Sequence, residues 1–184
     1  VIGIGSSNTS CDKANGKMLS YGFNVEYLAC DLSDQIMVKE LTDYIKSNYT
    51  KLDVLINNAG VSFASQKKNQ DYSEKDWIHT INVNLTGSFY CSNEVIKYML
   101  KRRNGSIINI TSINAELGFP RNPAYNASKG GLKMLGKAFA KDWSKYGIRV
   151  NNVGPGYFRT DMTSKRFKNK KYRSERENQT LLGR

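Results

Sequence analysis

Three side chains in the second half of the chain have the types and spacing of an acid–base site. Tyr125 and Lys129 are four residues apart, so on a helix they project from the same face. A phenol ordinarily has a pKa of ~10, and an ammonium beside it favours the phenolate and lowers that pKa. Ser112 follows an apolar run upstream, and its hydroxyl could hold a substrate oxygen while Tyr125 gives or takes a proton. The bare Tyr-x-x-x-Lys spacing is more often found on a surface helix, so its meaning depends on the surrounding chain.

The bulk composition indicates one globular domain over residues 1–184 and excludes several classes of site. The three cysteines are far apart and odd in number, which favours a reducing compartment over a disulfide framework or a zinc site. The single histidine argues against a His-rich metal centre, and no run approaches the roughly 18 apolar residues of a membrane span. We therefore expect a cytoplasmic protein without a metal site or a membrane partner.

The net charge of +12 is concentrated in two basic clusters. One is Lys97, Lys101, Arg102 and Arg103, and the other is Lys165, Arg166, Lys168, Lys170, Lys171, Arg173 and Arg176. Such runs are usually solvated faces or loops, with recognition of an anionic substrate or of nucleic acid as the alternatives. We interpret 163–178 as a basic substrate-lid loop, because the segment has little apolar content.

Apolar runs alternate with helical patterns along the chain. We predict strands at 1–5, 24–30, 52–56, 106–110 and 148–153, and two long helices at 74–102 and 125–146. Continuous apolar strands separated by helices are typical of a parallel sheet covered on both faces, with ligands beyond the carboxyl ends of the strands. Polar or Gly-Pro punctuation follows each predicted strand, at Ser6-Ser7, Asp31, Asn57-Asn58, Ser112 and Gly154-Pro155-Gly156. These residues mark the expected functional edge.

Five motifs occur in a fixed order: Asn57-Asn58-Ala59-Gly60, Asn84 in Val-Asn-Leu-Thr-Gly, Ser112, Tyr125-x-x-x-Lys129 and Pro155-Gly156. Each motif is weak alone, but together the chain resembles the short-chain dehydrogenase/reductase family over essentially its whole length. The resemblance implies a Rossmann-type, doubly wound α/β fold. It also implies hydride transfer between a nicotinamide dinucleotide and a carbonyl or alcohol carbon.

The resemblance assigns a role to each matching position. Tyr125 would be the general acid or base, Ser112 would orient the substrate carbonyl, and Asn84 would hold a water in the proton relay. Lys129 would bind the nicotinamide ribose and lower the pKa of Tyr125. The other implied cofactor contacts are Ser6, Ser7, Asp31, Leu32, Asn58, Ala59, Gly60, Pro155, Gly156 and Thr160.

One feature of the family is missing from the sequence. The family begins with a strand and a TGxxxGxG turn that holds the pyrophosphate, and Gly3-Ile4-Gly5 is too short to match it. Leu181-Leu182-Gly183-Arg184 resembles the close of a substrate lid, after which the family has a further helix and a last strand. We expect a domain truncated at both ends, without the central first strand, that does not bind dinucleotide as this piece alone.

The cofactor preference follows from the end of the first visible strand. NAD enzymes usually place a carboxylate there for the ribose hydroxyls, whereas this chain has Ser6-Ser7. Small hydroxyl side chains leave room for a 2′-phosphate, which favours NADP over NAD.

Within the family the chain is most similar to 3-oxoacyl-(acyl carrier protein) reductases and gluconate 5-dehydrogenase-like members. We therefore expect a small carbonyl or alcohol substrate that is anionic or bound to a carrier protein. The family also implies a homodimer or homotetramer built on the two long helices. The alternative is a non-catalytic dinucleotide- or nucleic-acid-binding protein on the same fold, which the basic charge favours and the complete Asn84, Ser112, Tyr125 and Lys129 set disfavours.

Overall fold

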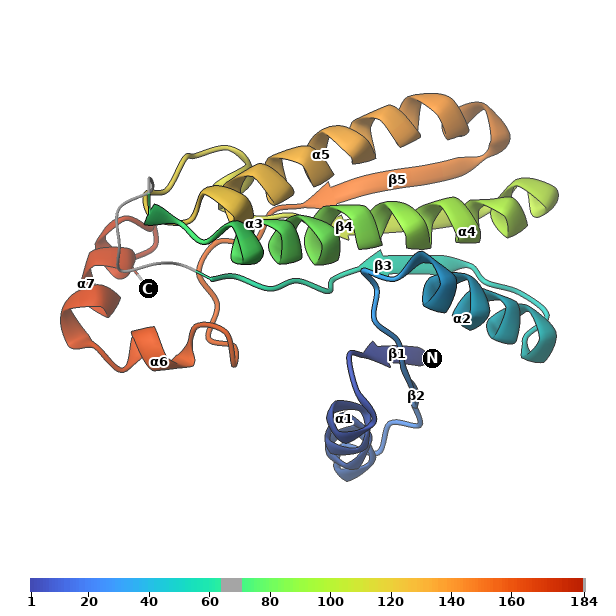
Figure 1. Ribbon diagram of the computed structural model, residues 1–184, viewed down its shortest axis with the longest axis horizontal. Helices are drawn as coiled ribbons and strands as arrows, with labels where there is room; N and C mark the ends of the chain where they lie inside the picture. The colour runs from blue at the N-terminus through green and yellow to red at the C-terminus, as the bar shows by residue number, and fades with distance from the viewer. Residues whose placement is uncertain (64–70, 184) are drawn as a thin grey trace.

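The computed structural model describes residues 1–63 and 71–183 and has an α/β architecture (Figure 1). The strands are β1 Ile2–Gly5, β2 Glu26–Ala29, β3 Val54–Asn57, β4 Gly105–Ile110 and β5 Ile148–Val153. The α-helices are α1 Asn8–Ser20, α2 Gln35–Asn48, α3 Glu74–Ile81, α4 Gly87–Arg102, α5 Pro123–Trp143, α6 Ser164–Phe167 and α7 Lys170–Asn178. A π-helical turn at Asn82–Thr86 joins α3 to α4, and 3₁₀ turns occur at Ile113–Ala115 and Ser144–Tyr146.

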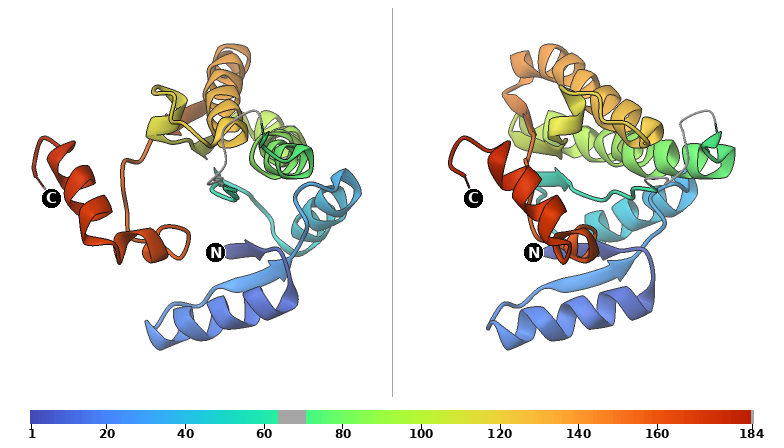
Figure 2. Two further views of the ribbon diagram at one scale, coloured as in Figure 1. Left: turned by 60° about the vertical axis from the view of Figure 1, so that its left-hand side comes forward. Right: turned by 90° about the vertical axis from the view of Figure 1, so that its left-hand side faces the viewer.

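All strand pairings are parallel, which confirms the predicted Rossmann-type arrangement of strands and helices. The strands form two sheets, a pair β1-β2 and a triplet β3-β4-β5. We call β1, α1 and β2 the two-stranded unit, and β3, β4 and β5 with α4 and α5 the three-stranded unit. Helices α2 and α4 lie side by side, and α1 lies on the other side of the two-stranded sheet from α2 (Figure 2).

Side-chain caps fix where the helices begin. Ser7 and Ser10 form a reciprocal capping box at the start of α1, and the Asp34 carboxylate accepts hydrogen bonds from two backbone N–H groups at the start of α2. Asn169 caps α7 by accepting from the Tyr172 N–H. Each cap satisfies backbone donors that the first helical turn leaves without a partner.

The main hydrophobic core lies between α4 and strands β4 and β5. Its buried members are Val95, Ile96, Met99, Ile107, Ile148 and Val150. A second, smaller cluster of Cys30, Val38 and Cys91 joins the end of β2 to α2 and α4. The core therefore supports β4, the strand that ends just before Ser112.

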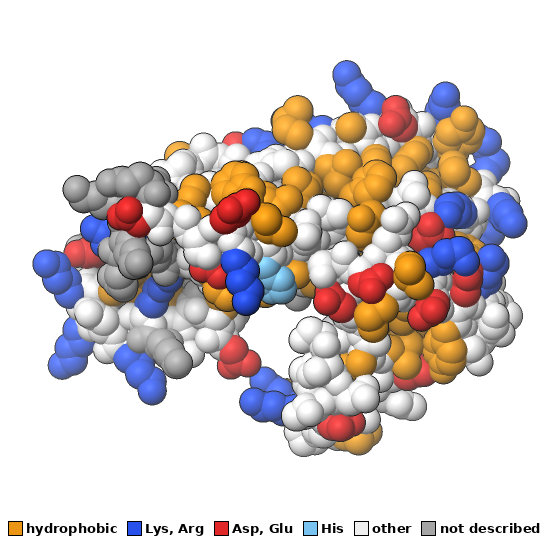
Figure 3. Space-filling view, in the orientation of Figure 1, with side chains coloured by type: hydrophobic (Ala, Val, Ile, Leu, Met, Phe, Trp, Pro, Cys, Tyr) orange, Lys and Arg blue, Asp and Glu red, His pale blue; other side chains and the backbone are white. Residues whose placement is uncertain are grey.

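A gap separates the two sheets between β1 and β3. A cavity of ≈ 750 Å³ lies there, lined from one side by Ile2–Ile4 and from the other by Val54–Ala59. The side chains of Ile4, Val54 and Ile56 are exposed by 37%, 48% and 57% respectively. Because apolar strand residues are ordinarily buried, these edges lack the cover that the triplet's inner strands have. Figure 3 shows the two-stranded unit as the lower lobe of the molecule.

Two predicted elements differ from the structure. The helix predicted at 74–102 is divided by the π-helical turn, so it is not a single regular helix. The segment 163–178 is not a loop but contains α6 and α7, because the Asn169 cap and an Arg173–Glu177 pair at i,i+4 spacing favour a helix despite the low apolar content. No helix among the described residues is long and apolar enough to cross a membrane.

Candidate active site

Helix α5 presents Tyr125 and Lys129 toward the end of β4. The helix begins at Pro123, whose fixed φ and missing N–H suit the first helical position. Lys129 is 3% exposed, and its Nζ donates a 2.7 Å hydrogen bond to the carbonyl oxygen of Ile110, the last residue of β4. The same Nζ lies 5.8 Å from the centroid of the Tyr125 ring. The predicted pair therefore shares one site at the carboxyl end of the sheet.

Ser112 lies two residues beyond β4, close enough to the Tyr125 phenol for its hydroxyl to act to lower the pKa of that group. Its Oγ also accepts from the Asn114 N–H and donates to Asn114 Oδ1, each at 3.2 Å. These bonds hold the hydroxyl at the start of a 3₁₀ turn. The predicted serine and tyrosine therefore lie close together.

Asn84 is fully buried in the π-helical turn between α3 and α4. Its Oδ1 accepts from the Val61 N–H at 2.8 Å, and its Nδ2 donates to the Val61 carbonyl and to Ser128 Oγ, both at 3.0 Å. A π-bulge shifts the helical register and is frequent at functional sites. Because both amide hydrogens are occupied, this side chain can hold a water only by accepting a hydrogen bond through Oδ1.

Gly60 brings the turn after β3 against this group. A Cβ at Gly60 would lie 3.4 Å from Asn84 Oδ1 and 3.5 Å from Lys129 Nζ. Asn84, Lys129 and Gly60 therefore converge, and Asn84 clamps the turn through Val61.

Burial governs the electrostatics of the pair. Desolvation lowers the pKa of Lys129 to about 8 and raises the pKa of Tyr125, while the hydrogen bond with Ser112 acts to lower the latter. We expected Lys129 to lower the pKa of Tyr125, but here desolvation dominates the phenol's pKa. The ammonium's contact with Tyr125 is with the ring face.

The remaining predicted positions divide into two groups. Pro155 is joined to the site, because its carbonyl accepts from the Ile113 N–H at 3.1 Å. Leu32 lies against the first turn of α4, where a Cβ on Gly87 would come within 2.7 Å of its carbonyl oxygen. Asn58, Ala59 and Gly156 are at least partly exposed near this edge.

Most residues of the second group form hydrogen bonds with residues close to them in the sequence. Ser7 caps α1, and Asp31 accepts from the Ser33 N–H and Oγ, which lowers the pKa of its carboxyl group. Ser6 is exposed at the end of β1, and Thr160 hydrogen-bonds to Thr163 in a turn before α6. The structure therefore brings together the acid–base residues but leaves the expected cofactor contacts of the two-stranded unit at a distance along the edge.

Several polar residues near the site were not predicted. Ser128 Oγ accepts from Asn84 and donates to the Tyr125 carbonyl, and Asn109 donates a hydrogen bond to Asn152 one strand away. Only its position between Tyr125 and Lys129 in the sequence could have indicated that Ser128 belongs to the site.

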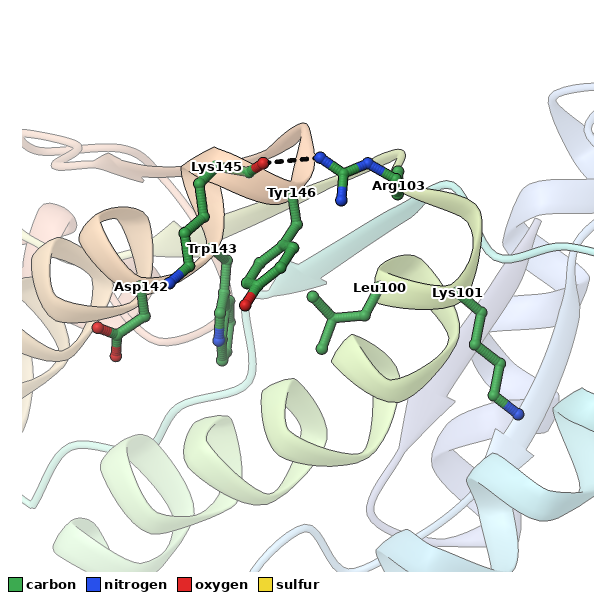
Figure 4. Close-up of a pocket in the computed structure, with 7 residues that line it drawn as sticks. All are labelled: Leu100, Lys101, Arg103, Asp142, Trp143, Lys145 and Tyr146. Carbon is green, nitrogen blue, oxygen red and sulfur yellow. Dashed lines mark hydrogen bonds between the residues drawn. The ribbon is translucent and has the colours of Figure 1, made fainter.

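A surface hollow near α5 lies at the opposite end of the helix from Tyr125. It has a volume of ≈ 690 Å³ and is lined by Leu100, Lys101, Arg103, Asp142, Trp143, Lys145 and Tyr146 (Figure 4). Arg103 Nη2 donates to the Lys145 carbonyl there. None of the predicted site residues lines this hollow.

The described residues fit one end of a nicotinamide dinucleotide. Lys129 carries three donors and spends one on Ile110, so two can face a ribose hydroxyl beside Tyr125. Gly60 has no side chain to obstruct that position. The pyrophosphate end lacks a Gly-rich turn in this sequence. Among the described residues, no cluster of three metal-ligating side chains occurs.

Comparison with known proteins places this geometry in a family. The family model described as short chain dehydrogenase matches residues 1–171. The chain is 33% identical over 165 residues to a gluconate 5-dehydrogenase of Gluconobacter oxydans, covering 90% of this chain and 64% of that protein. It is 39% identical over 150 residues to a 3-oxoacyl-[acyl-carrier-protein] reductase of Thermotoga maritima, covering 82% and 57%. The chain therefore spans about three-fifths of the length of these relatives.

A solved structure shares the arrangement of elements. It is a gluconate 5-dehydrogenase from Burkholderia cenocepacia in complex with NADP and tartrate, with a TM-score of 0.91 and 28% sequence identity. The match covers all of this chain and 71% of that one.

Proposed function

The chain belongs to the short-chain dehydrogenase family, and on that premise we propose that it is an NAD(P)-dependent oxidoreductase acting on a ketone or a secondary alcohol. The observation that carries the proposal is the convergence of Ser112, Tyr125 and Lys129 at the end of β4. A non-catalytic binding protein on this fold would have no use for a buried ammonium beside a phenol.

In the direction of reduction, Tyr125 is the general acid. Its Oη donates the proton to the carbonyl oxygen, and Ser112 Oγ turns its hydrogen from Asn114 Oδ1 to donate a hydrogen bond to the same oxygen. When bound, the reduced nicotinamide supplies the hydride that adds to the carbonyl carbon, so the product is the alcohol. Lys129 stabilises the phenolate that Tyr125 becomes, because its buried positive charge lies close to the ring. Asn84 holds the turn that presents Gly60, and accepts at most one further hydrogen bond from a water.

We expect Lys129 and Gly60 to face the nicotinamide ribose, and Asn58 and Ala59 to pass beneath the adenosine ribose. Ser6 and Ser7 offer hydroxyl groups and no carboxylate, which favours NADP over NAD. Asp31 and Leu32 would flank the adenine, and Pro155, Gly156 and Thr160 would lie toward the nicotinamide. The Burkholderia gluconate 5-dehydrogenase is in complex with NADP, which supports this preference.

The test follows NADPH consumption by the full chain with an acetoacetyl thioester and, separately, a keto-sugar acid, with NADH as the comparison cofactor. Tyr125→Phe should lower kcat/KM by at least ~100-fold, because it removes the acid while keeping the ring. Tyr146→Phe is the matched control, since Tyr146 lies at the far end of the same helical segment and its ring contacts would remain. A Tyr125→Phe variant with wild-type rates would overturn the proposal. Turnover of the thioester or of the sugar acid decides between a 3-oxoacyl thioester and a keto-sugar acid as the substrate class.

The basic helix α7 supports an anionic substrate. Lys168, Lys170 and Lys171 are exposed around its start. Reversing charge with Lys170→Glu and Lys171→Glu should raise KM several-fold at low salt, and the difference should shrink at ~1 M salt, where exposed charges are screened. The same change at Lys13 and Lys17, which are exposed on α1, is the matched control. If the variant and the wild type have the same KM at low salt, the basic residues of α7 take no part in substrate binding.

We further propose a cytoplasmic homo-oligomer. All three cysteines are free thiols and buried, as suits a reducing compartment. Phe89 on α4 and Met134 on α5 are 40% and 61% exposed, which supports contact between copies along these helices. Light scattering on the full chain would give the number of copies, and a monomer would contradict the assignment.

A further inference from the structure

Three asparagines form a row across the three-stranded sheet near its functional edge. Asn57 pairs in register with Asn109, and Asn109 with Asn152. Asn57 Nδ2 donates to Asn109 Oδ1 at 2.9 Å, and Asn109 Nδ2 donates to Asn152 Oδ1 at 3.1 Å. Asn57 and Asn109 are 6% and 1% exposed. We call these three residues the amide row.

The amide row is tied at both ends to the helices that cover the sheet. Asn57 Nδ2 donates to Ser92 Oγ of α4 at 3.0 Å. Asn152 Nδ2 donates to the Lys133 carbonyl of α5 at 2.9 Å. Buried amides cost stability unless they are satisfied, and here the row is satisfied by a continuous chain of bonds from α4 to α5.

Helix α5 approaches the row so closely that only glycine fits at the contact. A Cβ on Gly136 would lie 2.2 Å from Asn152 Oδ1 and 2.7 Å from Asn109 Nδ2. Lys133 is one helical turn after Lys129, whose Nζ is bonded to Ile110, the residue after Asn109. The helix therefore has two polar tethers to the sheet edge, one turn apart.

We propose that Asn152, acting through Asn109, Gly136 and the Lys133 carbonyl, is a positioning residue that sets the height of α5 against the end of β4. Lys129 can reach Ile110, and Tyr125 can reach Ser112, only at one axial position of the helix. The Asn152 tether fixes that position without touching substrate or cofactor. The inference rests on the proposed function, because its readout is proton transfer by Tyr125.

The first variant is Asn152→Asp, which keeps the shape and the acceptor for Asn109 but places an oxygen against the Lys133 carbonyl. Loss of this tether should lower kcat about ten-fold with KM changed less than two-fold, because small misplacements of reacting groups slow the chemical step. The matched control is Asn151→Asp, the neighbouring asparagine on β5, which is exposed. It introduces the same charge on the same strand and should leave both constants unchanged.

A double-mutant cycle tests the geometry independently. Gly136→Ser alone should be strongly destabilising, since its Cβ has no room beside Asn152. Asn152→Ala removes the nearer of the two obstructions, and the Asn109 amide, which then has no partner at position 152, shifts to bond the serine hydroxyl. The double variant Asn152→Ala, Gly136→Ser should therefore be more stable and more active than Gly136→Ser, a rescue that independent sites would not show.

The outcomes separate the two hypotheses. If Tyr125→Phe is inactive but Asn152→Asp keeps the wild-type kcat, the positioning role is wrong and the proposed function stands. If Tyr125→Phe remains active, the proposed function fails, while rescue in the cycle still reports on the contact. Absence of rescue, measured by urea unfolding, would overturn the assigned contact even where a single variant does not fold.

Discussion

The two-stranded and three-stranded units have the same strand–helix chemistry but differ in what surrounds their strands. In the triplet, β4 has neighbours on both edges and α4 and α5 against one face, and Ile107 is fully buried. In the pair, every residue of β1 and β2 keeps some contact with solvent, and Ile4 is 37% exposed. Both units contain apolar strands, so strand composition alone does not produce a core.

The difference shows where the chemistry can be precise. Tyr125, Lys129 and Ser112 rest on β4, β5 and α5, whose packing and amide row hold them in one arrangement. Ser6 and Ser7 follow β1, which has no described partner strand across the gap, and Asp31 follows β2, which pairs with β1. A proton-transfer group needs positions fixed within a fraction of an ångström, and only the three-stranded unit supplies that support.

The largest expected effect tests the packing contrast directly. Ile107→Ala should lower the free energy of unfolding by ~2–5 kcal/mol, because it opens a cavity among Val95, Met99 and Ile148. Ile4→Ala in β1 should cost about 1 kcal/mol or less, since that side chain is already partly in water. Urea unfolding of both variants gives the comparison. Equal losses would mean that Ile4 is packed as tightly in solution as Ile107.

The sequence predicted the strands but placed them in one parallel sheet, whereas the structure divides them into two sheets. Apolar runs and glycine or proline breaks located all five strands to within a few residues, and the polar residues after them located the functional edge. The gap between β1 and β3 could not be predicted from the pattern, because hydrophobic periodicity reports burial of a strand and not the identity of its neighbour. Family resemblance had to supply the expectation of a missing central strand.

The site was predicted in its residue types more fully than in its contacts. Tyr125, Lys129, Ser112 and Asn84 were identified from spacing and resemblance. Their hydrogen bonds were not, because the π-helical turn reads as ordinary helix and the bond from Asn84 to Val61 spans more than twenty residues. Asn109 and Asn152 read as ordinary polar breaks, since only the strand register aligns them.

A second effect depends on pH and is confined to the three-stranded unit. The pKa of Lys129 is lowered to about 8 in the folded protein, from an ordinary value near 10.5, so between these values the unfolded chain binds more protons. The contribution of Lys129 to the free energy of unfolding therefore increases as the pH rises above 8, by up to ~3 kcal/mol in total. Lys129→Met should lose that increase, and the wild type should gain on the variant by ~1–2 kcal/mol between pH 8 and 9.5.

The difference in unfolding free energy between the wild type and Lys129→Met contains the effect of Lys129 but not that of the buried thiols. Burial raises the pKa of Cys30 to about 11 and of Cys91 to about 12, so their contribution is lost as pH rises, and both proteins share it. The exposed Lys13→Met in the two-stranded unit is the control and should run parallel to the wild type. A constant difference between wild type and Lys129→Met over this range would show that the ammonium is hydrated in solution.

The smallest effect lies at a polar contact between the two-stranded unit and α2. Tyr44 donates a 2.8 Å hydrogen bond to Glu26 of β2, and Tyr49 donates to the other carboxylate oxygen. The bond from Tyr49, and to a smaller extent the bond from Tyr44, lowers the pKa of Glu26. Their contribution to stability is therefore present near neutral pH and is lost as the pH falls through the folded-state pKa of the carboxyl group. Because the pair of bonds is exposed, water competes for it, and Glu26→Gln should leave the midpoint of global unfolding unchanged.

Local opening should nevertheless respond, because α2 reaches β2 through this contact. Amide hydrogen exchange in Glu26–Ala29 should be faster in Glu26→Gln than in the wild type at pH 7, and equal to it at pH 3, where the wild-type carboxyl is also neutral. Exchange in Gly105–Ile110 of β4 should be the same in both proteins at both pH values. Faster exchange in β4 as well would show that the two units open together, and the contrast between them would then be one of burial and not of independent stability.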